Sequence, residues 1–195
     1  MLPPVASWQR TDAPGLETVS LTAGEQLAFS ASGHLLHPAA QPVCLSYRLQ
    51  VGRTGLVDNA EFTLHAPGPR TLNLLRNVAG RWHADGVAMP AFDSCSELDL
   101  QCGGLTNALP IRRLQLAPGD SAQLQVLFVR LPQLTLEICP QRYTRLADDA
   151  QGHARYRYQS PGFSAEISVD CHGLTLCYSD FLQRLAADSK PEQHA

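Results

Sequence analysis

The chain has 195 residues, 44% of them hydrophobic, and a formal net charge of −3. This length can bury a core, and it predicts a single domain over residues 1–187 followed by a flexible tail over residues 188–195. Fourteen of the fifteen basic residues are arginine, spread along the chain, and Lys190 is the only lysine. Nucleic-acid binding needs a basic patch or stripe, so this distribution argues against nucleic acid as a partner.

The N-terminal residues MLPPVASWQR lack the basic start and apolar core of a signal peptide. No apolar run approaches the ~20 residues that cross a bilayer, so we expect no transmembrane segment and a cytoplasmic protein. In that compartment the six cysteines should be mostly reduced. They contain no CxxC pair and their spacing fits no common metal site, so we predict neither a metal nor a cofactor.

Polar and apolar residues alternate with a period of two along most of the chain, which predicts strands separated by turn residues. A break by Pro132 predicts that residues 121–139 form either two strands or one bent edge strand. Only residues 179–187 show helical spacing, after a Ser179-Asp180 pair that could cap a helix. The pattern therefore predicts a mainly β protein, a many-stranded antiparallel sheet with one helix. The predicted strands are residues 17–21, 26–30, 43–51, 60–65, 70–75, 81–84, 93–99, 111–116, 121–139, 154–159, 163–170 and 174–178.

Two segments of the chain are similar in sequence. Residues 60–68 (AEFTLHAPG) resemble residues 165–173 (AEISVDCHG), and upstream the sequence YRLQ at 47–50 resembles YRYQ at 156–159. Two matches in the same order favour an internal duplication over chance. The hypothesis requires that both copies form hairpins with the same strand pairing.

The most polar stretch is DSCSELDLQCGGLTNALPIRRL, residues 93–114. As a strand, it would place Asp93, Glu97 and Asp99 on one face, with a spacing of roughly 7 Å between neighbours two residues apart. Like charges so close need compensation. One interpretation is a pocket whose carboxylates accept hydrogen bonds from sugar hydroxyls. The other is a structural network in which they pair with Arg112 or Arg113, and both can hold together.

Asp-x-Cys-x-acid-x-Asp-Leu at 93–100, followed by Thr-Asn-x-Leu-Pro-Ile-Arg-Arg-Leu at 106–114, closely resembles the signature of the putative glycolipid-binding family of bacterial proteins. The resemblance continues through residues 15–21, 131–146 and 169–185 and so covers nearly the whole chain. It implies an extended antiparallel sheet rolled around a single helix and a remote similarity to lipoprotein carriers. It also implies an acidic pocket for a lipid-linked sugar, and a homodimer.

Several polar residues are candidates to bind the ligand. Glu17 and Asp170 match acidic positions of the family and are expected to face the same cavity as the acidic block. Tyr143 either stacks on a sugar at a pocket rim or fills the core. Trp82 is expected to pack in the core. The complete predicted set is Glu17, Asp93, Glu97, Asp99, Asn107, Arg112, Tyr143 and Asp170.

The predicted function is therefore binding of a glycolipid or similar amphiphile without catalysis. The chain contains no GxSxG, HExxH or P-loop motif. One alternative is a hydrolase of a glycosidic or related bond that uses two carboxylates of the acidic block as acid and base. Another alternative is a structural protein whose dimer is its function.

Overall fold

The computed structural model describes residues 2–38 and 41–186, which contain one open sheet of fifteen strands and a single α-helix. The strand order is β8-β7-β6-β5-β4-β3-β2-β1-β15-β14-β13-β12-β11-β10-β9. Neighbouring strands are antiparallel, except that β9 and β10 run parallel. The strands are β1 (Val5–Arg10), β2 (Leu16–Thr22), β3 (Leu27–His37), β4 (Val43–Gly52), β5 (Val57–Ala66), β6 (Arg70–Arg76), β7 (Trp82–Ala84), β8 (Val87–Ala88), β9 (Glu97–Leu100), β10 (Ser121–Arg130), β11 (Thr135–Arg145), β12 (Ala154–Ser160), β13 (Phe163–Val169), β14 (Thr175–Tyr178) and β15 (Leu182–Arg184).

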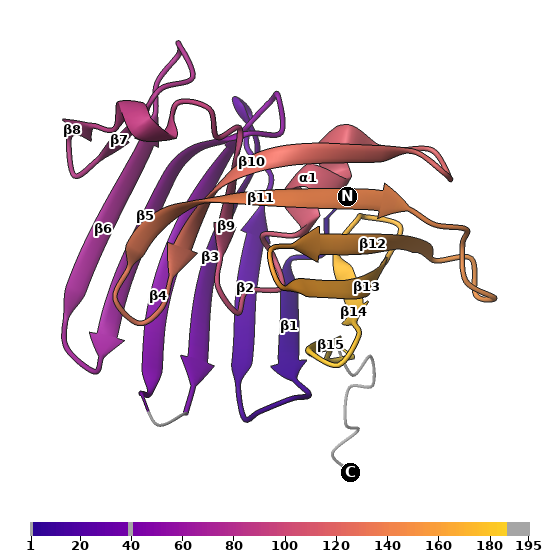
Figure 1. Cartoon of the computed structure of the whole chain (residues 1–195). Helices are drawn as coiled ribbons and strands as arrows, with labels where there is room; N and C mark the ends of the chain where they lie inside the picture. Colours follow the sequence, from indigo (N-terminus) through magenta and orange to yellow (C-terminus); the bar gives the residue numbers. More distant parts are fainter. Residues whose placement is uncertain (1, 39–40, 187–195) are drawn as a thin grey trace.

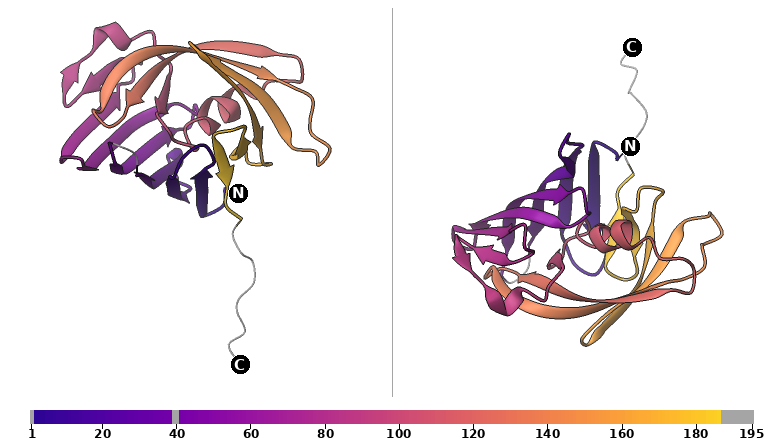
Figure 2. Two further views of the ribbon diagram at one scale, coloured as in Figure 1. Left: turned by 60° about the horizontal axis from the view of Figure 1, so that its bottom comes forward. Right: turned by 90° about the horizontal axis from the view of Figure 1, so that it is seen from above.

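The sheet rolls into two facing walls. Strands β1–β6 form one wall and β10–β13 the other, and the helix α1 (Ala108–Leu114) lies between them (Figures 1 and 2). The first and last strands, β1 and β15, pair in the middle of the sheet, with Trp8 opposite Arg184. The two free edges, β8 and β9, are consecutive in the chain and are joined through the short 3-10 helix η1 (Pro90–Phe92). The predicted sheet rolled around one helix is confirmed.

The core fills the space between the walls and the helix. Alternate residues of each wall strand point inward, as in β4, where every second residue from Val43 to Val51 is buried. Burying such a row of apolar side chains stabilises the roll, because each removes apolar surface from water. Trp8 and Trp82 are fully buried, and their indole nitrogens donate to the carbonyls of Thr175 and Cys95 at 2.8 and 2.9 Å. The expected core position of Trp82 is confirmed.

The turn residues of the sequence mark most connections between strands. Pro132 lies between β10 and β11, so residues 121–139 belong to two strands, as one of the two predictions had it. Asp85 and Gly86 both have positive φ angles, 49° and 81°, and form the two-residue turn between β7 and β8. Such a turn matches the twist of the strands that it joins.

The helix predicted at residues 179–187 is wrong: residues 179–186, the described part of this segment, contain no helix. Ser179 and Asp180 form a tight turn after β14, with Asp180 at φ 58°, and the next residues extend as β15. Pairing of β15 with β1 and β14 satisfies its backbone groups in the middle of the sheet. Tertiary hydrogen bonding therefore overrides the local helical spacing.

The helix occurs instead where a strand was predicted at 111–116. Pro110 lies in the first turn of α1, where a missing backbone N–H costs nothing. Ala108, Leu109 and Ile111 are buried against the core. The extended segment predicted at 93–99 is also shorter: Asp93 lies in a turn after η1, and only β9 is a strand.

The two similar segments form hairpins in the same register. In the first, Tyr47 pairs with Phe62 and Arg48 with Glu61. In the second, Tyr156 pairs with Ile167 and Arg157 with Glu166. Each pair occupies equivalent positions of the sequence match, so the pairing that the duplication hypothesis required is present.

The only α-helix of the described part of the chain has seven residues, and none there is long and apolar enough to cross a membrane. The tail predicted at 188–195 lies outside the described residues.

Candidate functional site

A cavity of about 640 Å³ opens between the two walls, at the end of the roll where β1 and β3 finish. We call it the main cavity. Its lining comes from both walls and from the segment that joins β9 to α1, so residues far apart in the chain meet there. The lining residues that matter most for its chemistry are Arg10, His37, Asp99, Asn107, Arg130 and Glu137.

One side of the main cavity is aromatic. Tyr158, Phe163, Tyr178 and Phe181 line it and pack edge to face, with ring centroids 5.3 to 6.4 Å apart. We call these four residues the aromatic cluster. Phe163 remains 43% exposed, so the cluster extends from the interior to the surface. Such a surface can pack against an acyl chain or against the apolar face of a sugar ring.

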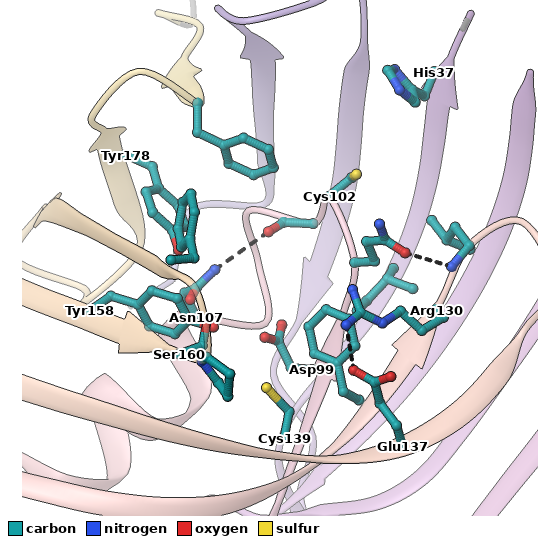
Figure 3. Close-up of a pocket in the computed structure, with 18 of the residues that line it drawn as sticks. His37, Asp99, Cys102, Asn107, Arg130, Glu137, Cys139, Tyr158, Ser160 and Tyr178 are labelled. Atoms are coloured by element: carbon teal, nitrogen blue, oxygen red, sulfur yellow. Dashed lines mark hydrogen bonds and ion pairs between the residues drawn. The ribbon is translucent and has the colours of Figure 1, made fainter. Parts of the chain in front are cut away.

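Buried polar groups lie beside the aromatic cluster. Asp99 accepts hydrogen bonds from Thr106 Oγ1 at 2.5 Å and from Gln141 Nε2 at 2.7 Å. The Tyr143 hydroxyl donates to Asn107 Oδ1 at 3.0 Å and also lies 3.3 Å from Gln141 Oε1. Asp99 and Asn107 are both buried and line the cavity (Figure 3). The network presents a carboxylate and an amide in fixed positions.

Asp99 is the carboxylate best placed to meet a ligand. Figure 3 shows it between Asn107 and Tyr158 on one side and Arg130 on the other. Burial raises the pKa of the Asp99 carboxyl above its ordinary value, and the hydrogen bonds from Thr106 and Gln141 oppose this in part. Each carboxylate oxygen can accept more than the single bond it receives, so Asp99 retains acceptor capacity toward the cavity.

Charged residues surround the cavity nearer to solvent. Arg130 pairs with Glu137 at 2.6 Å, and both side chains are more than a third exposed. Arg10 pairs with Asp12 at 2.6 Å, and its Nη1 lies 3.1 Å from His37 Nε2. The lining thus carries two carboxylates, Asp99 and Glu137, and two guanidiniums. Of the predicted acidic residues, only Asp99 lines the cavity.

Glu17 lies behind the cavity wall and is closed off from it. Its carboxylate accepts from the Tyr47 hydroxyl and from the Gly104 N–H, each at 2.5 Å, and it is 2% exposed. Burial raises the pKa of Glu17 to about 7. Gly103, the neighbour of Gly104, lines the main cavity, so Glu17 supports the loop that forms part of the wall.

Glu97 and Asp93 do not reach the main cavity. Glu97 is buried and pairs with Arg113, whose Nε donates to Oε1 at 2.6 Å, whereas Oε2 has no partner in the described part of the chain. Burial raises the pKa of Glu97, and Arg113 opposes that rise. Asp93 is exposed, 4.0 Å from Arg81. The structural interpretation of the acidic block therefore describes Glu97, and the three carboxylates do not converge on one site.

Arg112 and Asp170 lie near each other but away from the main cavity. Asp170 accepts from the backbone N–H groups of His172 and Leu174 and from Arg184 at 2.8 Å, so it closes its own turn. Arg112 donates to the His172 carbonyl. Both residues line another cavity, beside the C-terminal end of α1. Glu17 and Asp170 do not face the same cavity, contrary to the prediction.

Tyr143 fills the core and is 1% exposed, with its hydroxyl bonded inside the network. The aromatic cluster, by contrast, was not predicted as part of a site. The alternation of residues in β12 could have predicted that Tyr158 points inward on the same face as Tyr156. No spacing rule indicates Phe181, which the β14–β15 turn brings to the cavity.

Across residues 2–38 and 41–186, no three His, Cys, Asp or Glu side chains group closely enough to hold a metal ion. The main cavity combines a fixed acceptor network with a wall of aromatic rings.

Two comparisons with known proteins gave a match. The chain is similar to a DUF1089 family protein from Pseudomonas aeruginosa of known crystal structure, with 34% sequence identity and a TM-score of 0.76, over 90% of this chain and 95% of that one. No curated protein matches the chain. The family described as "Putative glycolipid-binding" matches residues 5–184. The chain therefore belongs to this family.

Proposed function

We propose that the protein binds an amphiphile with a sugar-like head group in the main cavity. The observation that carries this proposal is the meeting, in one cavity, of the aromatic cluster with the buried Asp99–Asn107 network. A volume of about 640 Å³ lies within the ~300 to 1,000 Å³ common for small-molecule sites. The family's description, glycolipid binding, points to the same class of ligand.

The two halves of such a ligand have different contacts in this proposal. Hydroxyls of the head group donate to Asp99, as carboxylates accept such bonds well. The apolar half packs on the aromatic cluster and on Ile138, which is 42% exposed beside the cavity. Contact between the acyl chain and these partly exposed side chains removes apolar surface of both from water, which favours binding. The predicted homodimer and cytoplasmic location stay predictions.

Filling the cavity should abolish binding. Ser160 lines the main cavity, and Ser160→Trp would place an indole in it. We expect a glycolipid that co-purifies with the wild-type protein from bacteria to be absent from this variant. Native mass spectrometry, with organic extraction and identification of the released lipid, measures this directly.

Ser164→Trp is the matched control, since Ser164 is exposed and pairs with Gln159 on the outer face of the same hairpin. It should carry as much lipid as wild type. Equal lipid in Ser160→Trp and wild type, or no lipid in any of the three, would count against the proposal.

Asp99→Asn should weaken binding of a glycosylated lipid by ~10-fold, the typical loss of one hydrogen bond to a charged group. Titration of a short-chain glucosyl lipid, followed by calorimetry, checks the affinity, and the thermal midpoint checks that the variant is folded. Hydrolysis of the lipid by wild type that disappears in Asp99→Asn would instead favour the hydrolase. An unfolded variant would indicate that Asp99 serves the structure.

A further inference from the structure

A third cavity lies at the opposite end of the roll from the main cavity. It has a volume of about 260 Å³ and takes residues from the start of β3 and the end of β4, whereas the main cavity includes His37 at the end of β3. Phe29 and His37 are eight residues apart on this strand, a separation of about 26 Å. Because Arg53, Arg112 and Arg113 all line this third cavity, we call it the arginine cavity; Arg112 also lines the cavity that contains Asp170.

Two elements bring the arginines together. Arg53 belongs to the turn between β4 and β5, and Arg112 and Arg113 lie in the last turn of α1. The turn lies directly against the helix, because a Cβ on Gly55 would be 3.2 Å from Cβ and Cγ of Arg113. Thr54 of the same turn also lines the cavity and adds a hydroxyl.

Carboxylates neutralise only part of the positive charge of the arginine cavity. Arg113 pairs with Glu97. Arg53 and Arg112 have no carboxylate within 4.0 Å in the described part of the chain, and their hydrogen bonds there go to the backbone carbonyls of Glu25 and His172. Each guanidinium carries five N–H donors. Most of these donors therefore remain available to a guest rich in acceptors.

The Arg112 guanidinium is partly removed from water in the free protein. Its guanidinium lies 5.6 Å from the ring centroid of Phe29, and the side chain is half-buried between the sheet and the helix. Burial lowers the pKa of Arg112, and Asp170 opposes this only in part. A bound anion would compensate for the lost hydration of this cation.

We propose that the arginine cavity binds a compact oxyanion, namely a phosphate group. Its volume suits a group of this size rather than a lipid, and planar guanidiniums bind phosphate oxygens in pairs. The phosphate comes either free in solution or on a lipid head group. This site is separate from the glycolipid site, and it stands whether or not the main cavity binds a lipid.

Titration of inorganic phosphate into the full chain at constant ionic strength, followed by calorimetry, tests the site. Wild type should bind phosphate, and Arg53→Gln should bind it ~10-fold more weakly, because a charge-assisted hydrogen bond is lost. Arg53 is exposed in its turn, so the variant should fold. Arg81→Gln removes the same charge from a side chain that is 70% exposed elsewhere, and should bind like wild type.

Absence of phosphate binding by wild type, or equal binding by Arg53→Gln, would overturn the proposal. A second titration with short-chain phosphatidate below its micelle concentration separates the two sources. Tighter binding than inorganic phosphate, weakened in Arg53→Gln, supports a lipid head group. Affinity no greater than that of phosphate, again weakened in Arg53→Gln, supports the free ion.

Discussion

Replacing Gly33 by alanine should lower the free energy of unfolding by about 3 kcal/mol, beyond what a single methyl usually costs. Gly33 pairs with Tyr47 across β3 and β4, and the Tyr47 ring lies over it to reach Glu17. A Cβ on Gly33 would be 2.2 Å from Tyr47 Cζ and 2.5 Å from its hydroxyl oxygen. The ring would have to move, and the buried Glu17 would lose a hydrogen bond.

Urea unfolding of wild type and Gly33→Ala measures the difference. Gly68→Ala is the matched control, because a Cβ there meets nothing within 4 Å, and it should lie within about 0.5 kcal/mol of wild type. A Gly33→Ala protein as stable as the control would show that Tyr47 does not need this position.

The stability of the protein should fall as the pH rises from about 4.5 through 7, owing to Glu17. Its pKa in the fold is about 7 because burial disfavours the charged form, against an ordinary value of 4.5. Below pH 4.5 the carboxyl is protonated in both the folded and the unfolded chain. Between the two values only the folded chain holds the proton, so raising the pH favours unfolding. The loss amounts to about 3 kcal/mol and is complete above pH 7.

Glu17→Gln should remove this slope, because a glutamine side chain stays neutral and can still accept from Gly104 and donate to Tyr47. Relative to the variant, wild type should lose the ~3 kcal/mol between pH 4 and 8. Glu61→Gln, at an exposed position of β5, should follow wild type throughout. Chemical denaturation in a pH series decides the matter, and parallel profiles for wild type and Glu17→Gln would refute the assignment.

Much of the sheet could be predicted because the alternation of polar and apolar residues and the turn residues can both be read from a few consecutive positions. Alternation of polar and apolar residues identified β4 and β6 to within one residue at each end, and the central part of β5. A two-residue turn needs positive φ angles, which favour residue pairs such as Asp85-Gly86, so the sequence itself indicates where the turn lies. The start of the acidic block was harder to predict, because Asp93 follows directly after the 3-10 helix η1 and a turn separates it from the short β9.

The helix and the cavity depend on contacts that no local pattern contains. Leu182 pairs with Arg10 from the other end of the chain, which makes a strand of a segment with helical spacing. Asp99 and Glu97 share a face of β9, yet one meets the cavity and the other meets Arg113. The residues that pack opposite each carboxylate decide which of the two becomes part of a site. Those residues can be identified only from the positions of both walls.

The joining of β8 to β9 limits how far the roll can open. On one side the walls are tied by hydrogen bonds between β1 and β15, and on the other the free edges are tied by residues 89–96. A chain of that length spans about 30 Å when fully extended, and η1 shortens it further. The two walls are thus held together by interstrand hydrogen bonds on one side and by the covalent connection from β8 to β9 on the other. The length of this covalent connection therefore sets an upper limit of about 30 Å on the separation of the two free edges.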